Sequence, residues 1–293
     1  MAIVSFKEML EDATARKYAV PMFDISNTTM MKAAVEVAEE MGSPVILASI
    51  PPDIEGNLLD YWVNGAKFAA QQVKVPVCLH LDHSPTVELC ARCADAGYNS
   101  VMLDASAEDF ATNSSLCKQV VDMVKSRGLH VEAELGHVAS GITGAANGMA
   151  ENGRSADSET VFTDPESVVR FIEETGVDAL AISIGTTHGV YVSAPELNIP
   201  LLKEIKKVCN VPLVLHGGSG TPEDQLKEAI ANGIAKINIY SELTAAFNTE
   251  LKKFLMNREQ MTCWFSVLTK EPDRAMREAM REKMVMFNSI NKF

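Results

Sequence analysis

Short apolar segments that alternate with helix-like segments are the feature of this sequence that most limits its possible folds. Eight such segments occur, bounded by Pro, Gly or Asp, and a stretch with helical periodicity follows each one. This alternation is typical of parallel βα units. The sequence therefore predicts an α/β protein, a (β/α)8 TIM barrel. Its strands are expected at residues 18–25, 44–50, 76–82, 99–104, 129–135, 178–184, 211–217 and 234–240.

Two further segments extend the predicted barrel. Ser5 and Glu8 form a capping box, which predicts an extra helix before the first strand. The amphipathic stretch 272–287 predicts a C-terminal helical extension that packs outside the barrel. The rival architecture, a doubly wound open sheet, needs a glycine-rich turn after the first strand, and residues 23–27 form no such turn.

The whole chain is expected to form one domain, residues 1–293, because a barrel of this class uses roughly 250 residues and no linker interrupts the sequence. The segment at about 136–163 differs from the rest. It has no clear period and is rich in Gly, Ala, Asn and Ser. Because it follows the fifth strand, it leaves from the end of the barrel where active sites form, and it is a candidate lid.

The charge balance limits the partners of the protein. A formal net charge of -13, without a cluster of Lys and Arg, argues against a nucleic-acid partner. No apolar run approaches the roughly 18 residues of a membrane span, and the N-terminus lacks the layout of a signal peptide. A cytoplasmic protein is expected. An anionic small molecule would have to be bound by a metal, a helix N-terminus or a glycine-rich loop.

Histidines lie in or just after three of the predicted strands. Active sites of (β/α)8 barrels lie at the C-terminal ends of the strands, so His83, His188 and His216 should meet at one barrel mouth. Three imidazoles are the ligand set of a catalytic zinc that keeps a fourth position open. We therefore expect Zn²⁺ on these histidines. His80 is expected to pack beside the site or to hydrogen-bond its ligands.

Carboxylates also lie at the strand ends. Asp82 is adjacent to His83, where a metal would keep its pKa low and allow it to exchange a proton with a substrate hydroxyl. Asp104 and Glu134 end two other strands. They are candidates for an alternative metal position, or for orienting the histidines through hydrogen bonds.

Glycine-rich turns at residues 185–189 and 216–220 follow two of the histidines. Backbone N–H groups in such turns form anion-binding sites, and phosphate commonly binds beside the seventh and eighth strands of a barrel. The candidate phosphate ligands there are Gly217, Ser219, Asn238 and Ser241.

Six segments carry a family resemblance: LHLDH, SVMLDAS, VEAELG, DALAISIGTTHGVY, PLVLHGGSG and AKINIYSEL. In this order they resemble the signature segments of class II fructose- and tagatose-bisphosphate aldolases, and the similarity covers nearly the whole chain. The resemblance implies a zinc-dependent aldehyde-lyase of carbohydrate metabolism. Its reaction would be the reversible retro-aldol cleavage of a ketose 1,6-bisphosphate to dihydroxyacetone phosphate and an aldehyde phosphate.

The resemblance also implies roles for individual residues. Asp82 would handle the proton of the C4 hydroxyl, while zinc would stabilise the enediolate as charge develops. Glu134 matches the glutamate near the alternative metal position, and a Na⁺ or K⁺ ion would assist. The phosphate would lie on Gly189, Gly217, Ser219 and Ser241, with Asn238 near the enediolate. A homo-oligomer, either a dimer or a tetramer, is expected.

The sequence departs from the family pattern around the aldehyde half of the site. The loop after VEAELG lacks the usual acidic stretch, and Glu151 is our candidate for the acid that abstracts the proton from dihydroxyacetone phosphate. Asp24 stands where the family usually has asparagine. Tyr240, a candidate substrate contact, replaces the aspartate of fructose enzymes and the alanine of tagatose enzymes. Val192 stands where fructose enzymes commonly carry lysine.

These comparisons favour tagatose 1,6-bisphosphate over fructose 1,6-bisphosphate, because the segments PVILASIPP, LDASAEDFATN and HGVYVSAPEL look closer to the tagatose branch. Three alternatives remain open. The chain could be an aldolase for another phosphorylated ketose, or a non-catalytic paralogue that binds a metal and a sugar phosphate. A metal-dependent hydrolase on the same fold is the third.

Overall fold

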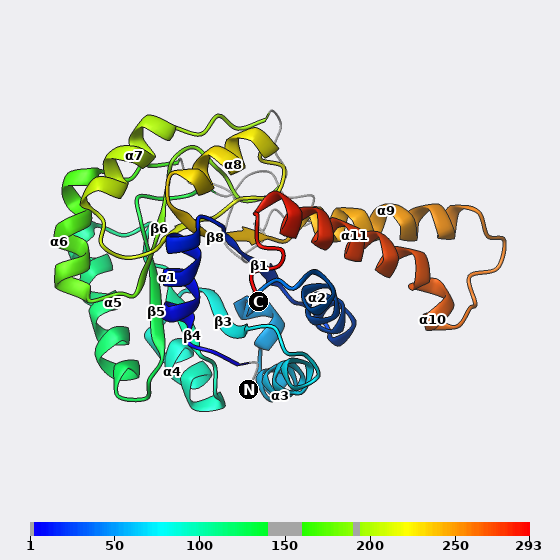
Figure 1. The fold of residues 1–293 in the computed structure, drawn as a ribbon. Coiled ribbons are helices and arrows are strands. Elements are labelled where there is room, and N and C mark those ends of the chain that lie inside the picture. Colours follow the sequence, from blue (N-terminus) through cyan, green and yellow to red (C-terminus); the bar gives the residue numbers. More distant parts are fainter. Residues whose placement is uncertain (1–2, 140–159, 190–193) are drawn as a thin grey trace.

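The computed structural model describes residues 3–139, 160–189 and 194–293 and contains a closed barrel of eight parallel strands (Figure 1). The strands are paired in the order of the sequence, and the last closes onto the first. Each lies within its predicted segment except β3, which ends two residues later. They are β1 Val20–Asp24, β2 Val45–Ser49, β3 Val77–Ser84, β4 Ser100–Leu103, β5 His130–Leu135, β6 Ala179–Ile182, β7 Leu213–Leu215 and β8 Ile234–Ile239.

Helices separate the strands, so the predicted (β/α)8 barrel is confirmed. A short 3-10 helix, η1 Pro51–Ile54, follows β2. No described helix is both long enough and apolar enough to span a membrane. The helices are α1 Phe6–Arg16, α2 Thr28–Met41, α3 Leu58–Gln71, α4 Val87–Ala96, α5 Phe110–Lys125, α6 Pro165–Thr175, α7 Ile199–Val208, α8 Glu223–Ala231, α9 Ser241–Met256, α10 Phe265–Leu268 and α11 Lys270–Met286.

The extra N-terminal helix α1 closes the N-terminal end of the barrel. Ser5 caps it by accepting a hydrogen bond from the backbone N–H of Glu8, as the capping box predicts. Phe6 and Leu10 on this helix are fully buried and pack with strand residues such as Met22 in the lower half of the barrel. The lower half of the barrel is therefore mainly apolar.

Strand residues on the outward side of the barrel form the main core against the helices. Leu47, Leu79 and Val101 are fully buried there, because strands covered on both faces bury nearly every side chain. This packing accounts for the continuous apolar runs in the sequence. It leaves the residues at the C-terminal strand ends free to carry polar groups.

The C-terminal helices extend beyond the barrel, as predicted. Helix α11 lies along α9 and against α2, and it buries Met276, Met280 and Met284 in the main core. In Figure 1 the helices α9, α10 and α11 form an arm that projects away from the barrel. The side chains of Trp264 and Phe265 on this arm are exposed.

The segment at 136–163 is described only at its two ends. The backbones of His137 and Val161 pair there through two hydrogen bonds. Gly136 has a positive φ of 81°, and a Cβ at this position would meet the carbonyl oxygen of Val161 at 2.7 Å. Glycine is therefore required for this close approach. Glu151 and Val192 both lie outside the described residues.

Candidate active site

Three buried histidines converge at the C-terminal end of the barrel. His83 comes from β3, His188 follows β6 and His216 follows β7, and each is at most 8% exposed. The ring centroids lie 4.8 Å apart for His83 and His188, 4.6 Å for His83 and His216, and 5.7 Å for His188 and His216. One nitrogen from each ring lies within 4.8 Å of the other two. The fold thus brings the three predicted ligands together.

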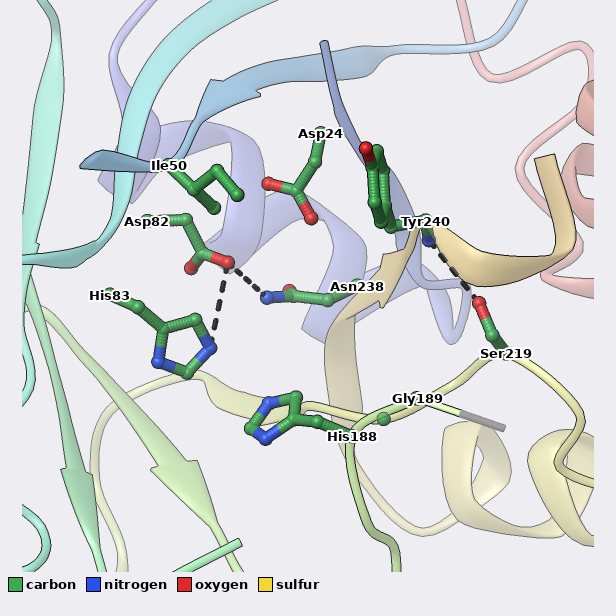
Figure 2. Close-up of a pocket in the computed structure, with 10 residues that line it drawn as sticks. Asp24, Ile50, Asp82, His83, His188, Gly189, Ser219, Asn238 and Tyr240 are labelled. Carbon is green, nitrogen blue, oxygen red and sulfur yellow. Dashed lines mark hydrogen bonds and ion pairs between the residues drawn. The ribbon is translucent and has the colours of Figure 1, made fainter. Parts of the chain in front are cut away.

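An irregularity in β3 turns His83 toward the site. The pairing of β3 with β4 shifts by one residue between Leu81 and Ser84, which is a β-bulge. His83 has a positive φ of 48° at this bulge. In a regular strand it would share the outward face of Leu79 and Leu81, which pack in the main core. The bulge therefore places Asp82 and His83, although adjacent, on the same pocket (Figure 2).

The unpaired ring nitrogens of this cluster are suited to a cation. In the described part of the chain, both ring nitrogens of His188 and Nε2 of His83 are buried without a hydrogen-bond partner. A buried polar atom without a partner costs about 1–3 kcal/mol. A metal ion on these lone pairs would remove that cost, and three neutral imidazoles are a common set for zinc. The residues therefore fit the metal that the sequence predicts.

Neighbouring charges set the protonation of the three rings differently. Burial and the repulsion from His83 and His216 hold the pKa of His188 well below its usual range. Burial alone would lower the pKa of His216, but hydrogen bonds with Glu132 and Glu134 raise it to about 10. The pKa of His83 is raised despite burial, because Asp82 and Asp104 face it. A cation at this site must therefore displace a proton from His216.

Asp104 and Glu134 lie beside the histidines. His83 Nδ1 lies 2.7 Å from Asp104 Oδ2, and His216 Nδ1 lies 3.1 Å from Glu134 Oε2. His83, Asp104 and Glu134 also form a second group whose potential ligand atoms lie within 4.8 Å of one another. The geometry is compatible with both uses that the sequence suggests, an alternative metal position and the orientation of histidine ligands.

Asp82 faces the pocket between the histidines and Asn238 (Figure 2). Its Oδ2 accepts a hydrogen bond of 3.0 Å from Asn238 Nδ2 and lies 3.6 Å from His83 Nε2. Burial alone would raise its pKa. The positive charge of the His83 ring, with His80 and Lys236, instead holds the pKa of Asp82 well below its usual range. Asp82 is therefore ionised and positioned to accept a proton.

A buried ion-pair network lies under the pocket. Lys236 is fully buried, and its Nζ lies 3.0 Å from each carboxylate oxygen of Glu132. The same Nζ donates a 2.8 Å hydrogen bond to Asn238 Oδ1. Glu132 also lies 2.9 Å from His216 Nε2. Burial would raise the pKa of Glu132, but the Lys236 ammonium and the His216 ring lower it to about 2. The network therefore carries fixed charges at neutral pH.

Sequence reasoning does not identify Glu132 as part of the site, although a signal for it exists. Glu132 and Glu134 are two residues apart on one strand, so they point to the same side of the sheet. Lys236 and Asn238 repeat this spacing on the last strand. Charged residues with period two inside a buried barrel strand indicate a polar interior layer. His80 lies in the same layer, with Nδ1 2.8 Å from Ser100 Oγ and its ring stacked on Phe6.

The predicted phosphate ligands occupy one end of the pocket. Gly189, Gly217, Ser219 and Asn238 line it. Gly217 has a φ of 67°, and a Cβ there would meet the carbonyl oxygen of Thr187 at 2.4 Å, so only glycine fits. Ser219 Oγ accepts hydrogen bonds from the backbone N–H groups of Tyr240 and Glu242. Ser241 begins α9 and does not line the pocket, but its buried Oγ has no hydrogen-bond partner in the described chain.

Asp24, Ile50 and Tyr240 also line the pocket (Figure 2). Asp24 ends β1 and is 7% exposed. The hydroxyl of Tyr240 lies 3.2 Å from Ser26 Oγ. The departures from the family pattern at Asp24 and Tyr240 therefore line the same pocket.

Comparisons with known proteins agree with this geometry. A family model described as class II fructose-bisphosphate aldolase matches residues 4–292. The YdjI aldolase from Escherichia coli K12 is 34% identical over 99% of both chains, with a TM-score of 0.85. A candidate fructose-1,6-bisphosphate aldolase from Coccidioides immitis is 28% identical over 97% of this chain and 96% of that chain, also with a TM-score of 0.85.

A fructose-bisphosphate aldolase from Campylobacter jejuni, 23% identical, shares the fold over 100% of this chain and 97% of that chain, with a TM-score of 0.79. The family match spans nearly every residue and includes all eight strands and the three histidines. The chain belongs to the class II fructose-bisphosphate aldolase family.

Proposed function

We propose that this protein is a zinc-dependent aldolase that cleaves a phosphorylated ketose to dihydroxyacetone phosphate and an aldehyde, and that also catalyses the reverse reaction. The observation that carries the proposal is the cluster of three buried histidines beside an ionised, buried Asp82. His83, His188 and His216 would hold the cation, with Glu134 and Asp104 as ligands at an alternative position. When bound, the cation would supply Lewis-acid polarisation of the ketose carbonyl and its neighbouring hydroxyl.

Asp82 has the position and charge of a general base. It would take the proton of the C4 hydroxyl while the C3–C4 bond breaks, so that the C4 oxygen becomes the carbonyl of the aldehyde. The electron pair of the broken bond passes to the three-carbon fragment, which is protonated at C3 to give dihydroxyacetone phosphate. Asn238 orients Asp82 through its 3.0 Å hydrogen bond and lines the same pocket.

The glycine-rich end of the pocket would bind the phosphate of the three-carbon fragment. Gly189, Gly217 and Ser219 line this end, and Ser241 begins the adjacent helix α9. Turns of this kind and helix N-termini direct backbone N–H groups at anions. A Na⁺ or K⁺ ion beside the phosphate belongs to the same proposal.

Glu151 is our candidate for the acid that abstracts the proton from dihydroxyacetone phosphate in the condensation direction. It lies outside the described residues. Exchange of that proton with deuterated solvent measures this step alone. Glu151→Ala should slow the exchange, whereas Asp82→Ala should not, and an unaltered rate in Glu151→Ala would assign the step to another group.

The configuration of the substrate at C4 is predicted separately. The segments that look closer to the tagatose branch favour tagatose over fructose. Tagatose 1,6-bisphosphate and fructose 1,6-bisphosphate differ only at the carbon next to the bond that breaks. The ratio of their kcat/KM values measures differential transition-state binding directly. A higher value for fructose would contradict this prediction, and negligible values for both would favour another phosphorylated ketose.

The experiment that tests the proposed activity couples the release of dihydroxyacetone phosphate to a dehydrogenase, with metal-replete and chelator-treated protein. Release that disappears on chelation and returns with Zn²⁺ supports the proposal. Release of inorganic phosphate instead would favour a metal-dependent hydrolase. Binding of sugar phosphate without turnover would favour the non-catalytic paralogue.

The exposed arm gives a basis for the predicted homo-oligomer. Met256, Trp264 and Phe265 are exposed on the arm formed by α9, α10 and α11. Large apolar side chains grouped on a projecting element are typical of subunit interfaces. A second copy of this chain, giving a dimer or a tetramer, is the occupant that we propose. Sedimentation of the protein and of a Trp264→Ser/Phe265→Ser variant tests it, because a monomeric wild type would contradict it. A cytoplasmic location belongs to the same set of proposals.

A further inference from the structure

Three consecutive residues after β5 make hydrogen bonds that lead to all three histidines of the metal site. Each uses a different group: the side chain of His137, the backbone N–H of Val138 and the backbone carbonyl of Ala139. All three residues are at most 8% exposed. One short stretch of chain therefore reaches three candidate ligands that come from separate strands.

The side chain of His137 acts on His83 through Ser106 and Asp104. The Ser106 hydroxyl donates a 2.7 Å hydrogen bond to Asp104 Oδ1, and Asp104 Oδ2 lies 2.7 Å from His83 Nδ1. Ser106 Oγ also lies 2.8 Å from His137 Nδ1. Because the one hydroxyl proton is directed to the carboxylate, Ser106 Oγ must accept from His137, so His137 carries a proton on Nδ1. This chain fixes the Asp104 carboxylate, which occupies Nδ1 of His83 and leaves Nε2 for a metal.

The backbone of the next two residues acts on the other two histidines. The Val138 N–H donates a 2.9 Å hydrogen bond to Glu134 Oε1, and Glu134 Oε2 lies 3.1 Å from His216 Nδ1. The His188 N–H donates a 2.8 Å hydrogen bond to the Ala139 carbonyl. Both contacts orient a histidine without placing another side chain against the cation.

His137 is itself held by two other parts of the barrel mouth. Its backbone pairs with Val161 through hydrogen bonds of 2.7 and 2.9 Å, and its carbonyl accepts a 3.1 Å hydrogen bond from Ser183 Oγ, directly after β6. Val138 and Ala139 have no polar side-chain atoms, so within this stretch only the side chain of His137 can transmit its position to a histidine by hydrogen bonding. Loss of a group that orients a metal ligand in this way typically costs about 10–100-fold in metal affinity.

We propose that His137 is a positioning residue of the metal site, and that residues 137–139 form a template that aligns His83, His188 and His216 for one cation. The inference rests on the proposed function, because it concerns the cation that this function requires. His137 would act without contacting the cation. Linkage makes the effect reciprocal, so a bound cation should also stabilise the 137–139 template.

The affinity for Zn²⁺, measured by chelator competition, tests the role of His137. His137→Ala should raise the apparent Kd about tenfold, the low end of the loss expected for an orienting group. His137→Asn should recover most of the affinity, because its amide nitrogen lies as many bonds from the backbone as Nδ1. His130→Ala is the matched control: this histidine also contacts a serine, 2.9 Å from Ser5 Oγ, but at the opposite end of the barrel, and its loss should leave the Kd unchanged. Equal affinities for the wild type and His137→Ala overturn the inference.

A double variant separates positioning from a general loss of stability. If His137 acts through Ser106, Ser106→Ala should weaken Zn²⁺ binding by a similar factor, and adding His137→Ala should weaken it little further. Losses that multiply in the double variant overturn this route, as does an unaltered Kd in Ser106→Ala. Ser106→Ala leaves the 137–139 template intact in sequence, so the route stays testable even if His137→Ala does not fold.

Hydrogen exchange of the wild-type protein tests the template without any substitution. Saturating Zn²⁺ should slow exchange of the Val138 N–H about tenfold relative to that of the Val131 N–H, which is also bonded to a carboxylate, that of Asp178, at the opposite end of the barrel. An equal effect at both N–H groups overturns the template. A wild type that binds no Zn²⁺ overturns the proposed function as well, whereas Zn²⁺-dependent cleavage with an unchanged Kd in His137→Ala overturns this inference alone.

Discussion

Asn238 donates a 3.0 Å hydrogen bond from Nδ2 to Oδ2 of Asp82, across the mouth of the barrel. Lys236 determines which way this amide faces. Its ammonium group has only donors and lies 2.8 Å from Asn238 Oδ1, so the amide oxygen must point down and the NH₂ group must point to Asp82. Asp82 is thus positioned by Asn238, which is itself oriented by Lys236 inside the barrel.

Asp82→Ala should lower kcat/KM for ketose cleavage by about 10²- to 10⁴-fold, because the C4 hydroxyl loses its proton acceptor. The variant should still bind the metal and exchange the proton of dihydroxyacetone phosphate, since neither step needs a base at C4. Steady-state cleavage checks the predicted loss of activity, and deuterium exchange on the same preparation checks that proton exchange is retained. Cleavage at a near-normal rate would reduce Asp82 to an orienting residue.

His188→Ala should remove the bound metal and abolish cleavage, because two ligands from the remaining strands bind a cation weakly. Metal content per chain, measured by plasma emission, is the direct readout. His130→Ala is the matched control. This histidine lies at the opposite end of the barrel, 2.9 Å from Ser5 Oγ, and its loss should leave the metal content unchanged. Equal metal content in both variants would exclude His188 as a ligand.

Metal affinity should increase with pH. The pKa of His216 is about 10, so in the metal-free protein this ring holds a proton at neutral pH, and the pKa of His83 is raised in the same direction. A cation must displace the proton of His216, and competition from protons weakens as pH rises. The apparent Kd for Zn²⁺, measured by chelator competition, should therefore fall between about pH 6 and about pH 8. An affinity that is independent of pH would show that the rings are neutral before metal binds.

Lys236→Met should destabilise the protein by about 3–5 kcal/mol, because it leaves the buried carboxylate of Glu132 without its ion-pair partner. Adding Glu132→Gln removes that charge and should recover part of the loss. Urea unfolding of the two single variants and the double variant measures the coupling between the side chains. If the two single effects simply add, the pair is not energetically coupled. Cleavage should also fall in Lys236→Met, since Asn238 loses the contact that orients it.

The strands of this barrel could be predicted from sequence because the pattern that specifies them is local. Each buried strand needs apolar residues that pack against the helices, and that requirement is visible within six to eight consecutive residues. The meeting of His83, His188 and His216 followed from topology alone. Parallel strands that close into a barrel bring their C-terminal ends to one mouth, whatever their separation in sequence.

Only the tertiary structure decided how these residues face one another. The bulge that turns His83 into the site depends on how β3 pairs with β4, and no local pattern specifies that shift. Lys236 and Glu132 are 104 residues apart, and Tyr240 and Ser26 are 214 apart. Such contacts depend on the register of distant strands and on the closure of the barrel. Sequence therefore determined which residues reach the mouth, whereas strand pairing determined their orientation and their charge state, because these arise from contacts between segments that are distant in the chain.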